Sequence, residues 1–124
     1  IIMRLLIIGF GSIGQRHYRN IKKNYPKIQI FILRIKKNTP ILNKNNKLIS
    51  KRNVKLNEIN SIDDAKKIIP HVVLICNPTS LHIDYAIIFA KLKSHIFIEK
   101  PISNNFNKIK KLELLIKKNK LKLM

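Results

Sequence analysis

Short apolar runs recur along the chain and alternate with segments whose apolar residues repeat at helical spacing. A continuous apolar run of about 4–8 residues is typical of a strand that is buried on both faces of a parallel sheet. Such runs predict strands over residues 4–8, 28–33, 72–76 and 96–98, with a shorter third strand over residues 54–56. Residues 121–124 resemble the beginning of a sixth strand.

Helices are predicted between these strands. They cover residues 12–24, a small segment between Ser61 and Pro70, residues 80–91, and a last segment that begins near Asn104 or Asn105. Ser61 with Asp64 three residues later resembles a capping box, which marks the start of a helix. The residues expected to face inward are Ile13, His17 and Ile21, then His82, Ala86, Phe89 and Ala90, and finally Phe106, Ile109, Leu112 and Ile116.

The order of these elements predicts the fold class. Strands that alternate with helices are typical of the α/β class, in which helices cover both faces of a parallel sheet. We therefore predict a doubly wound parallel sheet of the Rossmann type, with strand order 3-2-1-4-5. A length of 124 residues suits one such domain over residues 1–124. The polar stretch over residues 36–52 is predicted to be a loop.

The charge balance is unusual, because 26 Lys and Arg stand against 6 Asp and Glu and give a formal net charge of +20. Such a surplus attracts phosphates and nucleic acid at low salt. However, the lysines are spread along the whole chain, and only 6% of the residues are aromatic, with no Trp. Because single-strand binding sites rely on stacking aromatics, we expect no specific partnership with nucleic acid.

Other classes of protein are disfavoured by what the sequence lacks. Cys76 is the sole cysteine and sits in an apolar run, so a buried, inert thiol is expected and an internal disulfide is impossible. No Cys and His residues have zinc-site spacing, so no metal site is predicted. No apolar stretch reaches the length of a membrane span. We expect a cytoplasmic protein without membrane partners.

The clearest chemical motif is Gly9-Phe10-Gly11-Ser12-Ile13-Gly14, which fits G-x-G-x-x-G. In this motif the glycines allow a tight turn, close approach of backbone to a pyrophosphate, and close packing of helix on sheet. The helix N-terminus then offers N–H groups and its positive dipole end to the phosphates. The chain has only 3 glycines, and all of them belong to this motif. The motif follows a predicted strand and opens a predicted helix, so we predict dinucleotide binding.

The residue about 20 positions beyond these glycines bears on the choice of cofactor. An acidic residue there bonds the ribose 2′-hydroxyl of NAD, whereas a basic residue accommodates the 2′-phosphate of NADP. Arg34 holds this place, followed by Lys36 and Lys37. The sequence therefore favours NADP slightly over NAD, although basic residues are common throughout the chain.

Two later motifs point to a family. Asn77-Pro78-Thr79-Ser80-Leu81-His82 follows the fourth predicted strand, and Glu99-Lys100-Pro101 follows the fifth. With the glycine motif and Gln15-Arg16-His17, they resemble the Gfo/Idh/MocA oxidoreductases along nearly the whole chain. This resemblance implies hydride exchange between a nicotinamide cofactor and a secondary alcohol of a sugar or polyol. It also implies a homo-oligomeric enzyme with a C-terminal α+β substrate domain, and we expect that domain to be absent from this chain.

The resemblance assigns roles to individual residues. It implies that Lys100 is catalytic, donating a hydrogen bond to the reacting hydroxyl or to the ribose. Glu99 would anchor that ammonium or bond the nicotinamide side. The cofactor would also contact Asn77, Pro78, Thr79 and His82, although these residues equally suit a strand-to-helix turn followed by a structural histidine. In strand order 3-2-1-4-5 the three motifs lie beyond neighbouring strands and line one crevice.

Two departures from the family pattern are visible. No glycine occurs in Leu92-Lys93-Ser94-His95, so a residue with a side chain is expected to adopt positive φ there, at a cost of about 1 kcal/mol. The family's acid/base residues, commonly an Asp and a His, would lie beyond residue 124. We therefore expect a chain that is truncated and inactive by itself, and two alternatives stay open: a non-catalytic cofactor-binding module and an inactive gene fragment.

Overall fold

The computed structural model describes residues 2–34, 56–76, 79–99 and 105–124. The predicted loop over residues 36–52 lies outside these ranges, as do Asn77, Pro78 and Lys100. The described strands are β1 (Arg4–Ile8), β2 (Gln29–Leu33), β3 (Glu58–Ile59), β4 (Val72–Ile75) and β5 (His95–Ile98), and the described helices are α1 (Ser12–Asn24), α2 (Ile62–Ile68), α3 (Thr79–Lys91) and α4 (Phe106–Lys118).

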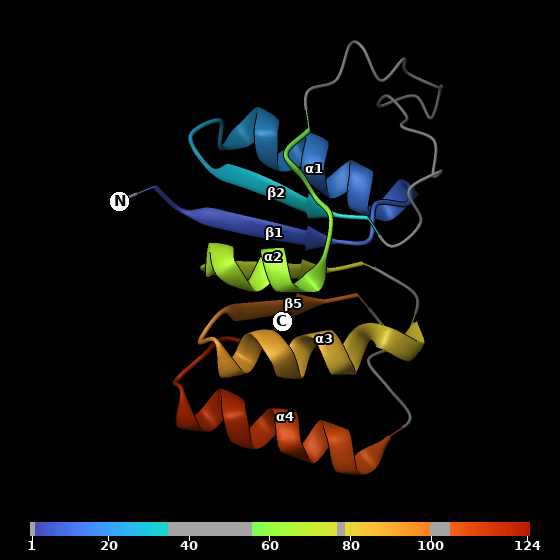
Figure 1. Ribbon diagram of the computed structural model, residues 1–124, viewed down its shortest axis with the longest axis vertical. Coiled ribbons are helices and arrows are strands. Elements are labelled where there is room, and N and C mark those ends of the chain that lie inside the picture. The colour runs from blue at the N-terminus through green and yellow to red at the C-terminus, as the bar shows by residue number, and fades with distance from the viewer. Residues whose placement is uncertain (1, 35–55, 77–78, 100–104) are drawn as a thin grey trace.

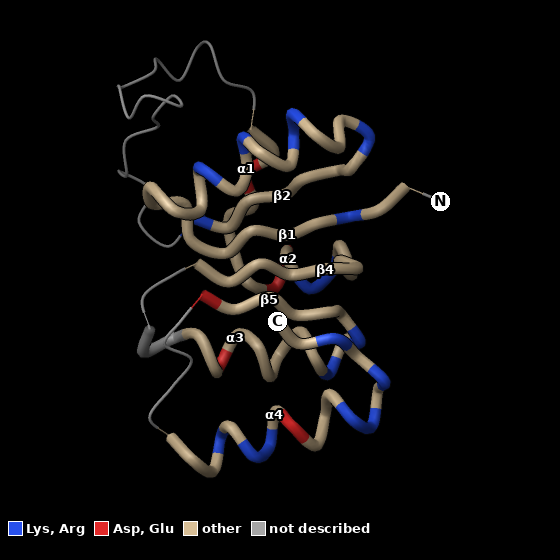
Figure 2. The backbone as a smooth tube through the Cα atoms, turned by 180° about the vertical axis from the view of Figure 1, so that it is seen from behind, with Lys and Arg blue, Asp and Glu red and all other residues tan. Residues whose placement is uncertain are grey.

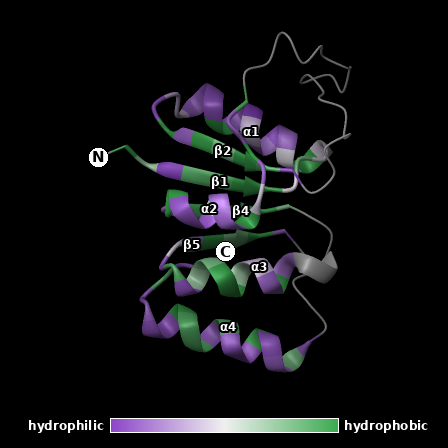
Figure 3. Cartoon of the chain, viewed as in Figure 1, coloured by the Kyte–Doolittle hydropathy of each residue, from purple (hydrophilic) through white to green (hydrophobic). Residues whose placement is uncertain are grey.

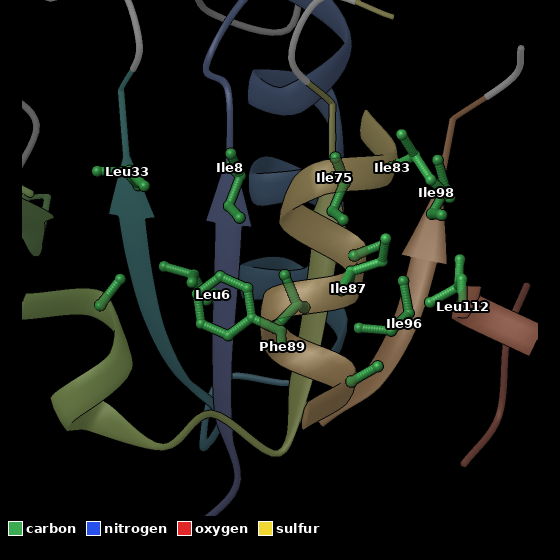
Figure 4. Close-up of a cluster of buried hydrophobic side chains, with 14 residues drawn as sticks. Leu6, Ile8, Leu33, Ile75, Ile83, Ile87, Phe89, Ile96, Ile98 and Leu112 are labelled. Atoms are coloured by element: carbon green, nitrogen blue, oxygen red, sulfur yellow. The ribbon is translucent and has the colours of Figure 1, made fainter. Parts of the chain in front are cut away.

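The strands form one parallel sheet, in which the described order is β3-β2-β1-β4-β5. Helix α1 covers one face, and α2, α3 and α4 pack against the other (Figures 1 and 4). The predicted doubly wound α/β fold and its strand order are therefore confirmed. The register aligns Ile8 with both Leu33 and Ile75, and Ile75 with Ile98, so these strands end at a common edge.

The two faces of the sheet bury different sets of residues, because successive side chains of a strand point to opposite faces. Hydropathy is accordingly highest in the strands, whereas the helices carry mixed surfaces (Figure 3). The larger core lies under α2, α3 and α4 and includes Leu6, Ile8, Val73, Ile75, Phe89, Ile96, Ile98 and Leu112 (Figure 4). The smaller core lies under α1 and includes Leu5, Ile7, Phe10, Ile30, Ile32 and Leu74.

The predicted position of the third strand and the predicted burial of Phe106 are wrong. The third strand lies at Glu58–Ile59, whereas Leu56 belongs to no strand. Its position is set by pairing with β2, where the Ile32 N–H donates to the Asn57 carbonyl at 2.9 Å. Phe106 was expected to face inward but is 73% exposed. As the first residue of α4 it lies one turn before the buried stripe, and Leu112 is the fully buried member of that helix.

The ends of the helices follow the predicted chemistry. The Ser61 hydroxyl accepts from the Asp64 N–H at 3.2 Å and caps α2, and the Asn105 side chain caps α4 in the same way by accepting from Lys108 N–H at 3.1 Å. Beyond α3, Lys93 adopts a φ of 65°, so the expected left-handed residue is found in the segment that lacks a glycine.

The last residues extend the sheet as predicted. Leu123 forms a parallel bridge with Ile96 of β5, and the Ile98 N–H donates to the Met124 carbonyl at 2.8 Å. Within the described part of the chain, no helix is both long and apolar enough to cross a membrane. Figure 2 shows cationic residues on several helices and near the C-terminal end, consistent with a charge that is distributed over the molecule.

Candidate functional site

The glycine motif forms a tight turn from β1 into α1. Gly9 has a φ of 88°, which favours glycine, and its N–H donates to the Leu33 carbonyl at 2.9 Å. A Cβ on Gly14 would lie 2.4 Å from the Gly9 carbonyl oxygen and 3.6 Å from the Cβ of Cys76. Glycine at position 14 therefore allows α1 to pack directly against the turn and against the end of β4.

Gly11 has the opposite environment. A Cβ built on Gly11 would have no heavy atom within 4 Å, so this residue borders open space at the edge of the sheet. Gly11 is the N-cap of α1, and no side chain caps the helix at this end. Because the first N–H groups of an α-helix lack partners within the helix, this end can donate hydrogen bonds to an anion.

The other motif residues divide between core and surface. The Phe10 side chain is 4% exposed and packs edge-on against Tyr18, with ring centroids 5.8 Å apart. Its backbone is held by the buried Gln15, whose Nε2 donates to the Phe10 carbonyl at 2.8 Å. Ser12 and Ile13 are exposed, which corrects the prediction that Ile13 faces the core. Phe10 can therefore offer only backbone groups to a ligand, whereas Ser12 and Ile13 can offer side chains.

Arg34 follows β2 but is not open to solvent. Its side chain is 2% exposed, and its Nη1 donates to Glu58 Oε1 at 2.9 Å. The Glu58 side chain is 40% exposed and belongs to the neighbouring strand β3. The prediction that Arg34 would receive a 2′-phosphate assumed a free guanidinium, and the structure instead pairs that guanidinium with a carboxylate.

A polar cluster lies where β4 and β5 end, on the face that α1 covers. His17 Nε2 and Glu99 Oε1 are 2.7 Å apart, with side chains 26% and 30% exposed. The His17 ring also packs edge-on against Phe97, with centroids 5.9 Å apart. Glu99 was predicted to pair with Lys100 or to bond the nicotinamide side, and its observed partner among the described residues is His17.

Cys76 lies beside this pair. Candidate ligand atoms of His17, Cys76 and Glu99 all lie within 4.8 Å of one another, a grouping that could hold a metal ion and that sequence spacing did not reveal. Desolvation by burial and, second, the negative charge of Glu99 raise the pKa of the Cys76 thiol from 9.0 to about 12. Cys76 is only half-buried, but its thiol stays protonated at neutral pH, so a metal ion would have to displace a proton to bind sulfur.

Two further predicted residues lie in the described part of α3. Thr79 is its first residue. His82 is 3% exposed, so its imidazole belongs to the interior of the domain, consistent with the structural alternative. Asn77, Pro78 and Lys100 were predicted for the same edge of the sheet and lie outside the described residues.

A small pocket lies elsewhere, between α1 and the amino-terminal part of β2. It has a volume of about 130 Å³ and is lined by Tyr18, Lys22, Pro26, Ile28, Gln29, Ile30 and Asn57. Sites for cofactors usually occupy about 300–1,000 Å³. The pocket is therefore too small for a dinucleotide, and the carboxyl edge of the sheet is the better candidate.

The parallel sheet has the strand order of a dinucleotide-binding Rossmann domain. The glycine turn and the uncapped N-terminus of α1 lie where that order switches between β1 and β4, as such a domain requires. More narrowly, residues 3–124 match the family model described as "Oxidoreductase family, NAD-binding Rossmann fold". The chain belongs to this family, the Gfo/Idh/MocA oxidoreductases.

Known proteins agree with this placement. The chain is 32% identical over 107 residues to myo-inositol 2-dehydrogenase of Thermotoga maritima, an alignment that covers 83% of the chain and 29% of the relative. A similar solved structure is that of the WlbA dehydrogenase from Bordetella pertussis in complex with NADH and UDP-GlcNAcA. The superposition covers 99% of this chain and 36% of that protein, with a TM-score of 0.75 at 18% sequence identity.

A second solved structure, myo-inositol 2-dehydrogenase from Lactobacillus plantarum, matches 100% of the chain and 36% of its own length, with a TM-score of 0.73 at 20% identity. At such identities the solved structures establish the fold. The chain thus spans about a third of the length of the relatives that it matches.

Proposed function

We propose that this chain binds a nicotinamide dinucleotide at the carboxyl edge of its sheet and serves as the cofactor domain of a dehydrogenase. The observation that carries the proposal is the turn from Gly9 to Gly14, in which Gly11 borders open space beside an uncapped helix N-terminus. A pyrophosphate needs such space and such N–H donors. Backbone groups of Gly9, Phe10 and Gly11, with Ser12 and Ile13 beside them, would hold the diphosphate.

The nicotinamide would lie toward the ends of β4 and β5, near Asn77, Pro78, Thr79 and Glu99. When bound, this cofactor supplies a hydride acceptor or donor. Lys100 follows Glu99 directly, and we propose that its ammonium donates a hydrogen bond to the reacting oxygen. The Glu99 carboxylate that precedes it contacts His17, with Nε2 and Oε1 2.7 Å apart.

We further propose that the substrate is a sugar or polyol with a secondary alcohol. Support comes from the relatives, which are named for myo-inositol or bound to a UDP-sugar acid. No acid/base residue for the proton of that alcohol is assigned among these 124 residues. We therefore expect this chain alone to bind cofactor without appreciable turnover of polyols.

A titration of the chain with NADH and with NADPH, followed by the fluorescence of the reduced nicotinamide, tests the central proposal. The chain has no Trp, so protein emission does not obscure the signal. Saturable binding is expected, and Gly11→Ala should weaken it at least about tenfold because the new methyl occupies the pyrophosphate space. Gly11 has no steric neighbours, so a circular dichroism spectrum equal to that of the wild type is expected. Absence of saturable binding to the folded wild type would refute the proposal.

A further inference from the structure

The pair formed by Arg34 and Glu58 lies where the adenine ribose of a bound dinucleotide would be recognised. Arg34 directly follows β2 and lies 20 positions beyond Gly14, the place at which Rossmann domains read the ribose 2′ substituent. A basic residue there normally indicates NADP. In this chain the arginine is buried and already bonded, so the cofactor preference depends on its partner as well.

Glu58 reaches the same place from β3. The register aligns Glu58 with Ile32, and registered residues of parallel strands point to the same face. Arg34 lies two residues beyond Ile32 and so continues along that face. This explains why Arg34 Nη1 and Glu58 Oε1 meet at 2.9 Å although 24 residues separate them in the chain.

The two partners differ in exposure. The Arg34 side chain is 2% exposed, whereas the Glu58 side chain is 40% exposed. The cation therefore lies beneath the surface and the carboxylate lies at it. A carboxylate with one oxygen bonded to arginine retains further lone pairs that can accept hydrogen bonds from a ligand.

We propose that Glu58 sets the cofactor preference of this domain in favour of NAD. Its carboxylate accepts a hydrogen bond from the 2′-hydroxyl of the adenine ribose, and Arg34 positions that carboxylate. A 2′-phosphate would meet the negative charge of Glu58 and would find the Arg34 guanidinium already paired. This inference rests on the proposed function, and it reverses the preference for NADP that Arg34 alone suggests.

Competitive titration tests this assignment. The dissociation constants of NADH and NADPH are measured by nicotinamide fluorescence for the wild type and for Glu58→Gln. Wild type is expected to bind NADH at least about tenfold more tightly than NADPH, since charge-assisted hydrogen bonds contribute more than neutral ones. Glu58→Gln keeps the size of the side chain and an acceptor for Arg34, and it should lower this ratio about tenfold or more.

Glu113→Gln is the matched control. Glu113 lies on the exposed face of α4, so this substitution raises the net charge by the same amount as Glu58→Gln at a place remote from the proposed site. It should leave the ratio of the two dissociation constants unchanged. Thermal unfolding of each variant verifies that the fold is retained, and the wild-type ratio tests the assignment even if Glu58→Gln does not fold.

The outcomes separate the two proposals. Binding of neither dinucleotide to the folded wild type refutes the proposed function and this inference together. The wild type could instead bind both dinucleotides without preference, or prefer NADPH, or keep its ratio of dissociation constants in Glu58→Gln. Each of these results would mean that Arg34 and Glu58 form a purely structural pair. The proposed function would then stand and the assignment of Glu58 would be wrong.

Discussion

Substitution of Gly14 by alanine should destabilise the fold, although alanine is the better helix former. The added Cβ would lie 2.4 Å from the Gly9 carbonyl oxygen and 3.3 Å from the Gly9 carbonyl carbon. Ordinary contact begins near about 3.4 Å, so α1 and the turn must separate by about 1 Å. Both obstructing atoms belong to the backbone, and a change of rotamer cannot relieve the contact.

The magnitude follows from two opposing effects. Alanine in a helix interior is favoured over glycine by about 1 kcal/mol. Overpacking of a close contact costs about 1–3 kcal/mol, and displacement of α1 would also disturb its packing on Cys76 at the end of β4. Since Gly14 is only the third residue of α1, the helical gain is reduced. We expect a net loss of about 1–2 kcal/mol.

Thermal unfolding followed by circular dichroism measures this loss. For a domain of this size, a loss of about 1–2 kcal/mol lowers Tm by roughly 3–10 °C. Gly11→Ala is the matched control, since its Cβ has no neighbour within 4 Å and only an N-cap preference of at most about 1 kcal/mol is at stake. A Gly14→Ala variant with a Tm equal to or above that of the wild type would refute the steric argument.

Further predictions concern Lys93 and Cys76. Lys93→Gly should stabilise the domain by about 0.5–1 kcal/mol, because φ of 65° suits glycine. Lys91→Gly, at the last residue of α3, should not stabilise it, because Lys91 has helical geometry that glycine disfavours; urea unfolding compares the two variants. A loss of stability in Lys93→Gly would contradict the strain assigned to this turn. The thiol of Cys76 should react slowly with iodoacetamide at pH 8, since its pKa is about 12, and fast reaction in the folded state would count against its burial. Because the folded state disfavours the thiolate, the contribution of Cys76 to the free energy of unfolding is fully present below pH 9.0 and is lost as pH rises toward 12. Cys76→Ala should remove this part of the pH dependence.

Patterns that depend on near neighbours in the chain were predictable. Apolar runs placed β1, β4 and β5 to within one residue, and the hydroxyl of Ser61 placed the start of α2. The absence of a glycine after α3 correctly indicated a strained residue, which is Lys93. Each of these features is determined by a few consecutive residues, and therefore the sequence carries the whole signal.

Features that depend on pairing between distant segments were not predictable in detail. The third strand has only two residues, Glu58–Ile59, and its position is set by hydrogen bonds with β2 instead of by its own composition. Phe106 is exposed because the buried part of α4 begins after its first turn, and no local pattern specifies where that part begins. The grouping of His17, Cys76 and Glu99 escaped a search for metal-ligand spacing because the three residues come from three elements.

The sequence by itself determined the fold class, the strand order and the turn at Gly9 to Gly14, because periodicity and glycine placement encode local geometry and leave few topologies. Only the tertiary structure decided the electrostatic partners of the candidate site. Arg34 is charged in any conformation, but whether that charge is available depends on Glu58, which approaches from a neighbouring strand. A side chain's identity determines its charge and donors, and the groups folded around it determine which ligand can use them.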